Sequence, residues 1–396
     1  MKNSNVKNAF EQLNGVGLNP LGTAITSLKE IFTWEEAQQN ELKGYLISQN
    51  FKHHYENNVF YQKVCKESNV SPEDIKTFDD LHKIPVIPVN MFKQTDSHML
   101  LSKPLNEIEF EMRSTGTSGI PSLSRRDSDT VDQCLFGIYA MYRNIFKFSK
   151  GAGLFLFPSP EEVPEMGMVK ALNMFSGLFD ATKCLVKRAS FKPEEAIEVL
   201  ENWEGRHTRH IIGPPFLVYK LVKYLKKNNI RLNLDKNSKV INLGGWKRFT
   251  GMEISRSEFN QECSEYLNIP ESAVRDMYGL VETNGLSIEC EFQNKHVSPW
   301  THFSIRDHKD INKEVRPGRR GVLFIYDPTS LSYPAFIQTE DLVYLKENHQ
   351  CECGRNSQQV VYLSRIKGAE IGCCAINLEK HMDEVEQKKK SEKVEL

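Results

Sequence analysis

The chain has 396 residues, of which 39% are hydrophobic and 26% are charged, and this length allows roughly two to three domains. Its formal net charge of −1 gives it no general attraction to nucleic acid or to an anionic membrane, so neither partner is expected. The N-terminus lacks the apolar core of a signal peptide, and no apolar stretch could span a bilayer. The nine cysteines are not spaced like those of a small disulfide-stabilised domain. We therefore expect a cytoplasmic protein with reduced thiols.

Residues 1–100 are predicted to be mostly helical. Thr33 is the predicted N-cap of a helix that runs to Phe51, because two glutamates follow it and apolar residues then recur at helical spacing. The stretch 81–89 contains two prolines and several valine or isoleucine residues, which predicts an extended connector into the next region.

From residue 108 to about 345, apolar runs alternate with amphipathic stretches, which predicts an α/β fold. We predict strands at 108–112, 152–158, 181–186, 210–213, 239–243 and 273–279, helices at 130–146, 165–175, 192–203, 216–227 and 253–267, and then β-rich segments at 299–305, 321–327, 334–338 and 342–346. Ligands of open α/β sheets bind beyond the carboxyl ends of the strands. Glycines follow four of these strands, at 116–119, 213, 244–245 and 279, which favours a ligand site there, although glycine also punctuates ordinary strand–helix units.

The stretch 111–122, Glu-Met-Arg-Ser-Thr-Gly-Thr-Ser-Gly-Ile-Pro-Ser, is typical of a polyphosphate-binding loop. Gly116 and Gly119 let the backbone approach a ligand, so that successive N–H groups can converge on an anion. The loop has neither the Gly-Lys-Ser/Thr of a Walker A loop nor the Gly-x-Ser-x-Gly of a nucleophile elbow, and an ordinary surface turn is the alternative. Four hydroxyl residues add short hydrogen-bond donors: Ser114, Thr115, Thr117 and Ser118.

Four stretches in a fixed order resemble the adenylate-forming enzymes, which include the acyl-CoA synthetases. Ser114-Thr-Gly-Thr-Ser-Gly-Ile-Pro resembles their phosphate loop, and Asp276-Met-Tyr-Gly-Leu-Val-Glu-Thr resembles their Tyr-Gly-x-x-Glu segment. Gln338-Thr-Glu-Asp-Leu is similar to their Arg-Thr-Gly-Asp-Leu segment, and Leu363-Ser-Arg-Ile-Lys-Gly to the Gly-Arg-x-Asp hinge. Cys351-Glu-Cys-Gly-Arg is similar to the phenylacetate-CoA ligase branch of the group.

About thirty residues follow Arg365, too few for the small C-terminal domain with a catalytic lysine that acyl-CoA synthetases carry. The chain therefore resembles the acyl-protein synthetases of bacterial bioluminescence, short members of the same group. The resemblance implies an α/β fold of the acyl-CoA synthetase type without the usual small C-terminal domain. We expect a helical region packed on the core at 1–100, an α/β adenylate-forming core at 101–295, a β-rich subdomain with the hinge at 296–383, and a charged tail at 384–396.

The resemblance implies that the protein uses ATP and Mg²⁺ to convert a long-chain fatty acid into acyl-AMP, with release of pyrophosphate. The acyl group would then pass to an enzyme cysteine as a thioester and be delivered to a fatty-acid reductase, with an acyl-transferase as a further partner. Two alternatives stay open: an acyl-CoA or acyl-carrier ligase of the same superfamily, and a non-catalytic scaffold of a reductase complex.

The resemblance also implies roles for single residues. The 114–119 stretch would hold the β- and γ-phosphates, Glu282 would bind Mg²⁺, and Asp341 would accept hydrogen bonds from the ribose hydroxyls. Their ordinary alternatives are a surface glutamate at a helix start and a turn aspartate before a strand. Five further residues would contact adenine, ribose or the α-phosphate: Gly244, Gly245, Tyr278, Gly279 and Arg365.

One position departs from the family pattern. Ser122 stands where many relatives carry a lysine after the loop proline. Arg125 or Arg126 would then have to supply the positive charge.

Two groups of thiols are of interest. The preferred acyl acceptor is Cys373, because it follows Gly372 as the family's acceptor cysteine follows a glycine, and Cys374 is the second choice. The alternative is that the two cysteines are only small buried apolar residues. His349, Cys351 and Cys353 invite a zinc interpretation. Because Cys-x-Cys is tighter than most structural zinc spacings and no fourth ligand is evident nearby, we favour a β-turn there.

Overall fold

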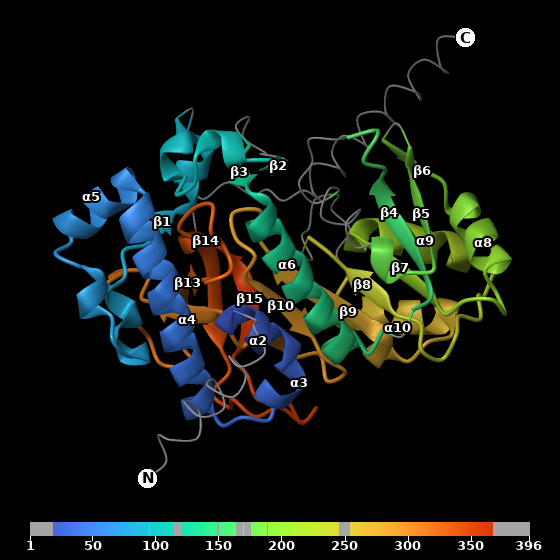
Figure 1. Ribbon diagram of the computed structural model, residues 1–396. Helices are drawn as coiled ribbons and strands as arrows, with labels where there is room; N and C mark the ends of the chain where they lie inside the picture. The colour runs from blue at the N-terminus through green and yellow to red at the C-terminus, as the bar shows by residue number, and fades with distance from the viewer. Residues whose placement is uncertain are drawn as a thin grey trace.

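The computed structural model describes residues 19–94, 96–114, 121–148, 150–163, 169, 176–187, 189–244 and 254–366. Over these residues the chain is an α/β protein built on one long mixed sheet of thirteen strands, with helices packed against it (Figure 1). This confirms the predicted fold class. In the described part of the chain, no helix is both long enough and apolar enough to cross a membrane.

One part of the sheet is parallel. Its strands are β4 (Ala152–Pro158), β5 (Ala181–Lys187), β6 (Ser190–Phe191), β7 (Arg209–Gly213), β8 (Val240–Asn242) and β9 (Val274–Gly279). They lie in the order β9-β8-β7-β4-β5-β6, and all neighbours are parallel except the last pair. Strands β4 and β7 are buried along their whole length, as expected when helices cover both faces of a parallel sheet. The continuous apolar run at 152–158 therefore predicted β4 to the residue.

The helices of this part lie close to their predicted positions. They are α6 (Ser128–Met141), followed by the π-helical turn η6 (Tyr142–Phe146), then α8 (Pro193–Asn202), α9 (Pro215–Lys227) and α10 (Arg256–Leu267). Helix α9 shows why the periodicity was readable: Leu217, Leu221 and Leu225 recur every four residues and are all buried. The predicted helix at 165–175 lies, except for residue 169, outside the described residues.

Three of the four predicted glycine positions lie at the carboxyl ends of neighbouring parallel strands. Gly213 ends β7, Gly279 ends β9, and Gly244 follows β8 with a φ of +92°, which glycine adopts without strain. The fourth position differs. Within the described part of the chain, strand β2 (Phe110–Arg113) pairs only with β3 (Leu123–Arg126), in a separate antiparallel hairpin. The strand predicted at 108–112 is therefore present as β2, but it pairs in this hairpin and is not part of the main sheet.

The other part of the sheet is antiparallel. Its strands are β10 (Leu286–Glu289), β11 (Lys295–Val297), β12 (His302–Arg306), β13 (Gly321–Tyr326), β14 (Phe336–Leu345) and β15 (Gln359–Arg365). The two strands predicted at 334–338 and 342–346 are one strand, β14. The polar residues between them interrupted the apolar pattern. Asp341 stays paired with Arg365 of β15, whereas the pairing of β14 with β13 shifts register here and the Thr339 hydroxyl donates to the Leu323 carbonyl over 2.8 Å.

Strands β10, β11 and β15 were not predicted as strands. They connect the two parts of the sheet, because β10 pairs with β9 and β11 pairs with both β10 and β15. The sheet is thus continuous across residue 295, and the division of the chain into regions at that point stays a prediction.

The N-terminal part is helical, with α2 (Pro20–Thr26), α3 (Leu28–Ile31), α4 (Glu36–Asn57) and α5 (Val59–Glu67). Thr33 is not the N-cap of α4, because its hydroxyl donates to the Glu30 carbonyl at the end of the preceding helix. Glu35 caps α4 instead, in a reciprocal capping box with Gln38. The two glutamates therefore marked the helix start, but the predicted cap lay two positions too early.

Helices α4 and α5 pack on the antiparallel strands. The rings of Phe51 and Tyr61 lie 6.3 and 6.2 Å from that of Phe336 on β14. The predicted extended connector at 81–89 begins and ends in helical turns, but Ile84 has extended backbone and β1 (Ile87–Pro88) pairs in parallel with β14. The remaining short helical turns are η1 (Pro72–Asp74), η2 (Phe78–Lys83), η3 (Val89–Lys93), η4 (Ser97–Leu100), η5 (Leu105–Glu107), η7 (Ser176–Leu178) and η8 (Glu271–Ala273).

Candidate active site

Three residues from three separate motifs meet in one partly buried group. Tyr278 comes from β9, Asp341 from β14 and Arg365 from β15. The Tyr278 hydroxyl donates to Asp341 Oδ2 over 2.6 Å, and Arg365 Nε lies 3.3 Å from Asp341 Oδ1. Burial, with the Asp341 carboxylate beside it, raises the pKa of Tyr278 well above its usual value, so the phenol stays a hydrogen-bond donor. The Asp341 carboxylate is thus held between a phenol and a guanidinium.

Glu282 lies just beyond β9 and is only 5% exposed. Its burial raises its pKa, while a hydrogen bond with the Ser122 side chain and the charges of Arg365 and Lys93 act in the opposite direction. The structure therefore places Glu282 beside the hydroxyl of Ser122, the residue at which the resemblance would place a lysine. The charge of Arg365 also acts on Glu282. Lys93, on η3, had not been predicted as a site residue.

The base of the predicted phosphate loop is closed by two hydrogen bonds. The Ser114 amide donates to the Ser122 carbonyl over 2.9 Å, and the Ser122 amide donates to the Ser114 hydroxyl over 2.8 Å. The loop residues between them, 115–120, lie outside the described residues. Since Ser122 also contacts Glu282, the ends of the loop lie against the Glu282 segment.

The two arginines after the loop are bound to protein groups. Arg125 Nε lies 3.0 Å from Glu111 Oε1. Arg126 is buried and donates to the Val281 carbonyl over 2.7 Å and to the Asn284 side chain. Arg126 thus fastens β3 to the segment that carries Glu282. That one of these arginines supplies the missing lysine charge stays a prediction.

A buried aspartate orders the same segment from the other side. Asp327 Oδ2 accepts hydrogen bonds from the Thr283 hydroxyl and the Asn284 amide, each over 2.7 Å. Asp327 is fully buried at the end of β13. Sequence reasoning missed this residue, because an aspartate after an apolar strand also reads as an ordinary turn residue.

The remaining predicted site residues divide into two sets. Gly244 and Gly279 lie at the ends of the neighbouring strands β8 and β9, as described above. The others fall outside the described residues: Thr115, Gly116, Thr117, Ser118, Gly119, Gly245, Cys373 and Cys374.

The family model described as "Acyl-protein synthetase, LuxE" matches residues 25–383, which is most of the chain. The chain belongs to the LuxE acyl-protein synthetase family. This confirms the resemblance that the four motifs had suggested.

Named relatives agree with this assignment. The chain is 29% identical over 317 residues to a long-chain-fatty-acid–luciferin-component ligase of Aliivibrio fischeri, covering 79% of this chain and 82% of the relative. It is 26% identical over 357 residues to the ligase of the same name from Vibrio harveyi, covering 87% and 89%.

Solved structures support the fold of this LuxE family member. The chain is similar to 2-hydroxyisobutyryl-CoA ligase in complex with 2-HIB-AMP and CoA, with a TM-score of 0.62 for an open conformation and 0.64 for the thioesterification state. Sequence identity is 15% in both cases, with 85% of this chain covered and 77% and 70% of the ligase. This likeness confirms the predicted adenylate-forming fold.

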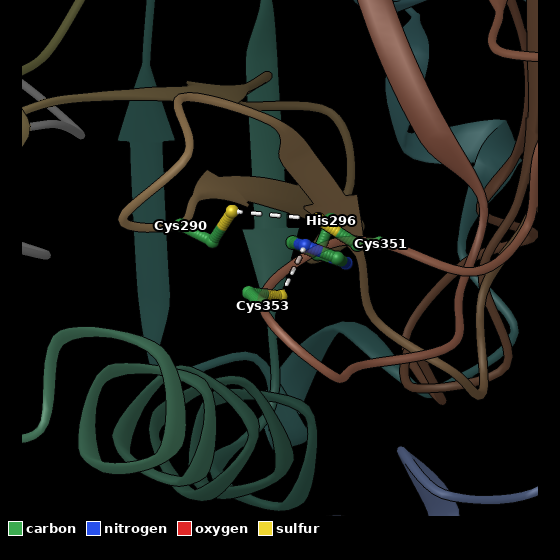
Figure 2. Close-up of side chains that lie close together, drawn as sticks. All are labelled: Cys290, His296, Cys351 and Cys353. Carbon is green, nitrogen blue, oxygen red and sulfur yellow. Dashed lines mark hydrogen bonds between the residues drawn. The ribbon is translucent and has the colours of Figure 1, made fainter.

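The predicted thiol cluster of this LuxE family member has a different composition from the one expected. His349 lies apart, with Nε2 3.3 Å from the Gln39 side-chain oxygen. Cys351 and Cys353 instead face Cys290 and His296, as Figure 2 shows. A turn is present, since the Gly354 amide donates to the Cys351 carbonyl over 2.9 Å, but the expectation that no fourth ligand lies nearby was wrong.

Proposed function

We propose that this chain uses ATP to convert a long-chain fatty acid into acyl-AMP and then carries the acyl group as a thioester on one of its own cysteines. Its membership of the LuxE family and the names of its relatives support this function. The observation that carries the proposal is the convergence of the loop base at Ser122, the buried Glu282, and the group formed by Tyr278, Asp341 and Arg365.

Each of the two chemical steps breaks and forms one bond at the reacting centre. In the first, a carboxylate oxygen of the fatty acid attacks the α-phosphorus of ATP, the bond between this phosphorus and the bridging oxygen breaks, and pyrophosphate leaves. In the second, a cysteine thiolate attacks the acyl carbon, the carbon–oxygen bond to the phosphate breaks, and AMP leaves. The protein has to stabilise negative charge on the departing pyrophosphate.

These residues are proposed to surround a bound nucleotide. We propose that the 114–119 stretch holds the β- and γ-phosphates and that Asp341 accepts hydrogen bonds from the ribose hydroxyls, while Arg365 reaches the ribose or the α-phosphate. Adenine would lie between the ring of Tyr278 and bare backbone. The glycines that would provide this backbone are Gly244, Gly245 and Gly279.

Glu282 is suited to Mg²⁺. A buried carboxylate needs compensating positive charge, and Mg²⁺ takes one or two carboxylates together with phosphate oxygens. When bound, the ion would neutralise charge on the phosphates. The positive charge of Lys93 also acts on Glu282 and favours its ionised form.

Asp341→Asn is expected to raise the KM for ATP by about tenfold or more, because a charge-assisted hydrogen bond contributes about 1.5–3 kcal/mol. The test is steady-state exchange kinetics. Glu340→Gln is the matched control, since Glu340 neighbours Asp341 on β14 and its carboxylate lies 3.6 Å from Arg365. Equal effects of the two changes would mean that Asp341 acts only through Arg365, and the ribose contact would be rejected.

Fatty-acid-dependent exchange of labelled pyrophosphate into ATP tests the adenylation step. We expect exchange that requires Mg²⁺ and a fatty acid. Assays with acids of increasing chain length would find the preferred substrate. If no acid in such a series supports exchange by the folded protein, the chain is not an adenylating enzyme.

We further propose that the acyl-protein is consumed by a fatty-acid reductase. A thioester on a protein thiol is a carrier intermediate, so a second enzyme has to remove the acyl group, and an acyl-transferase could supply the free acid. Gel filtration of this protein mixed with the reductase should give earlier elution than either alone. Unchanged elution at micromolar concentrations would count against a stable complex.

A further inference from the structure

Four potential metal ligands lie together at the junction of β10, β11 and the loop before β15. The Sγ atoms of Cys290, Cys351 and Cys353 and a ring nitrogen of His296 all lie within 4.8 Å of one another, and Figure 2 shows the four side chains pointing inward. Cys290 Sγ is 3.8 Å from Cys351 Sγ, and Cys353 Sγ is 3.3 Å from His296 Nε2.

The Cys290–Cys351 and Cys353–His296 distances are close to two edges of a zinc tetrahedron. Zinc binds sulfur at about 2.3 Å and imidazole nitrogen at about 2.0–2.1 Å. In a regular tetrahedron such bonds separate two sulfurs by about 3.8 Å and a sulfur from a nitrogen by about 3.5 Å. Three thiols and one imidazole are also the soft ligand set that zinc prefers.

The surroundings hold the ligands in place. Cys290 and His296 are fully buried, and Cys351 is 5% exposed. His296 Nδ1 lies 2.7 Å from the Ser357 hydroxyl, so donation from this nitrogen leaves Nε2 unprotonated on the side that faces the thiols. The side-chain amide of Asn294 donates to Cys351 Sγ over 3.2 Å.

The backbone explains how residues so distant in sequence meet. Cys290 and His296 flank the turn of the β10–β11 hairpin. Strand β11 pairs with β15 through His296 and Gln359, which brings the loop before β15 over the hairpin. The turn at Cys351–Gly354 then directs both thiols of the Cys-x-Cys pair toward the hairpin.

We propose that Cys290, His296, Cys351 and Cys353 bind a structural Zn²⁺ ion. All four positions of the tetrahedron are filled by protein groups, which is the arrangement of structural sites, whereas catalytic zinc keeps a position open. The ion would fasten the hairpin to the loop that leads into β15, the strand of Arg365. The same loop also receives the N-terminal helices, because the Asn356 amide donates to the Phe32 carbonyl over 2.7 Å.

Metal analysis of the purified full-length protein tests the site. We expect about one zinc ion per chain, and substitution by Co²⁺ should give the absorption bands of a tetrahedral thiolate site. His296→Ala and Cys353→Ala should lower the zinc content by about tenfold or more and lower the melting temperature, because metal binding contributes to folding. His296→Cys should retain zinc, since it preserves four ligands.

Cys263→Ala is the matched control, because Cys263 is a fully buried thiol on α10 outside the cluster, and this variant should keep the metal. Folded wild-type protein with less than about a tenth of a zinc ion per chain and no uptake of Co²⁺ would overturn the proposal. So would a Cys290–Cys351 disulfide, found by mass spectrometry of the unreduced protein. Because the wild-type measurement needs no variant to fold and no enzymatic activity, its result stands apart from the test of adenylation.

Discussion

Replacing Glu282 with glutamine should lower fatty-acid-dependent ATP–pyrophosphate exchange by about 10²-fold or more, as does loss of a group that stabilises transition-state charge. Glutamine keeps the size of the side chain and its contact with Ser122 but removes the charge proposed to bind Mg²⁺. The decrease should lie mainly in the maximal rate of exchange. An exchange rate within a factor of about three of the wild type would remove Glu282 from the mechanism.

The same substitution should not destabilise the protein at neutral pH. Burial raises the pKa of Glu282 in the folded state, so the folded protein holds this proton more tightly than the unfolded chain. The resulting stability is present below the unfolded-state pKa and is lost as pH rises through the folded-state pKa. Above that pH, Glu282→Gln should be at least as stable as the wild type, and its unfolding free energy should fall less as pH rises. Urea unfolding at several pH values, without nucleotide, measures this.

Glu289→Gln is the matched control for loss of a buried carboxylate. Glu289 is as buried as Glu282, but its carboxylate lies 2.7 Å from Arg256 and 3.8 Å from Lys295, and it is not among the proposed nucleotide contacts. Its loss leaves two partly buried cations with fewer partners, so this variant should lose stability while its folded fraction retains exchange. The opposite pattern in the two variants would contradict the assignment of Glu282 to chemistry.

Replacing Cys373 with serine should abolish the acyl label on the protein and leave ATP–pyrophosphate exchange intact. Adenylation does not use the thiol, whereas the thioester requires it. The choice of Cys373 rests on the family resemblance and on its distance along the chain from Arg365, since eight residues span at most about 29 Å and can therefore reach the proposed site. Gel autoradiography of protein incubated with ATP and labelled fatty acid measures the label.

Cys374→Ser separates the two neighbouring thiols. If label is lost in this variant and kept in Cys373→Ser, the acceptor is one residue further along. If label survives in the double variant, the acyl acceptor is not in this pair, and the C-terminal thiol mechanism is wrong for this chain.

The parallel part of the sheet could be predicted because its signals are local. The apolar run at 152–158 is long enough to mark a strand by itself, and the leucines of α9 mark a helix face by their spacing. The antiparallel part was harder, because its strands alternate or are interrupted by polar residues. Strand β14 contains Asp341. The charge of Asp341 makes it a candidate for nucleotide binding, and the same charge led the sequence analysis to predict two strands here instead of one.

The features that could not be predicted from the sequence depend on contacts between residues far apart in the chain. The partners of Cys351 and Cys353 lie more than fifty residues earlier, in a hairpin that was not predicted, so a search for a fourth ligand near His349 could not find them. Lys93 had no local signal, because only the folded chain brings it near Glu282. The four motifs, in contrast, were recognisable from their order, and three of them meet through Tyr278, Asp341 and Arg365.

The central claim, that this chain activates a fatty acid and then holds it as a thioester, is tested most directly by one labelling measurement. The purified protein is incubated with Mg²⁺, ATP and a radiolabelled long-chain fatty acid, denatured, and divided between neutral hydroxylamine and a salt control. We predict label that depends on ATP, survives denaturation and is released by hydroxylamine but not by salt. Active exchange without any protein-bound label would contradict the self-acylation step, and absence of both exchange and label would contradict the whole account.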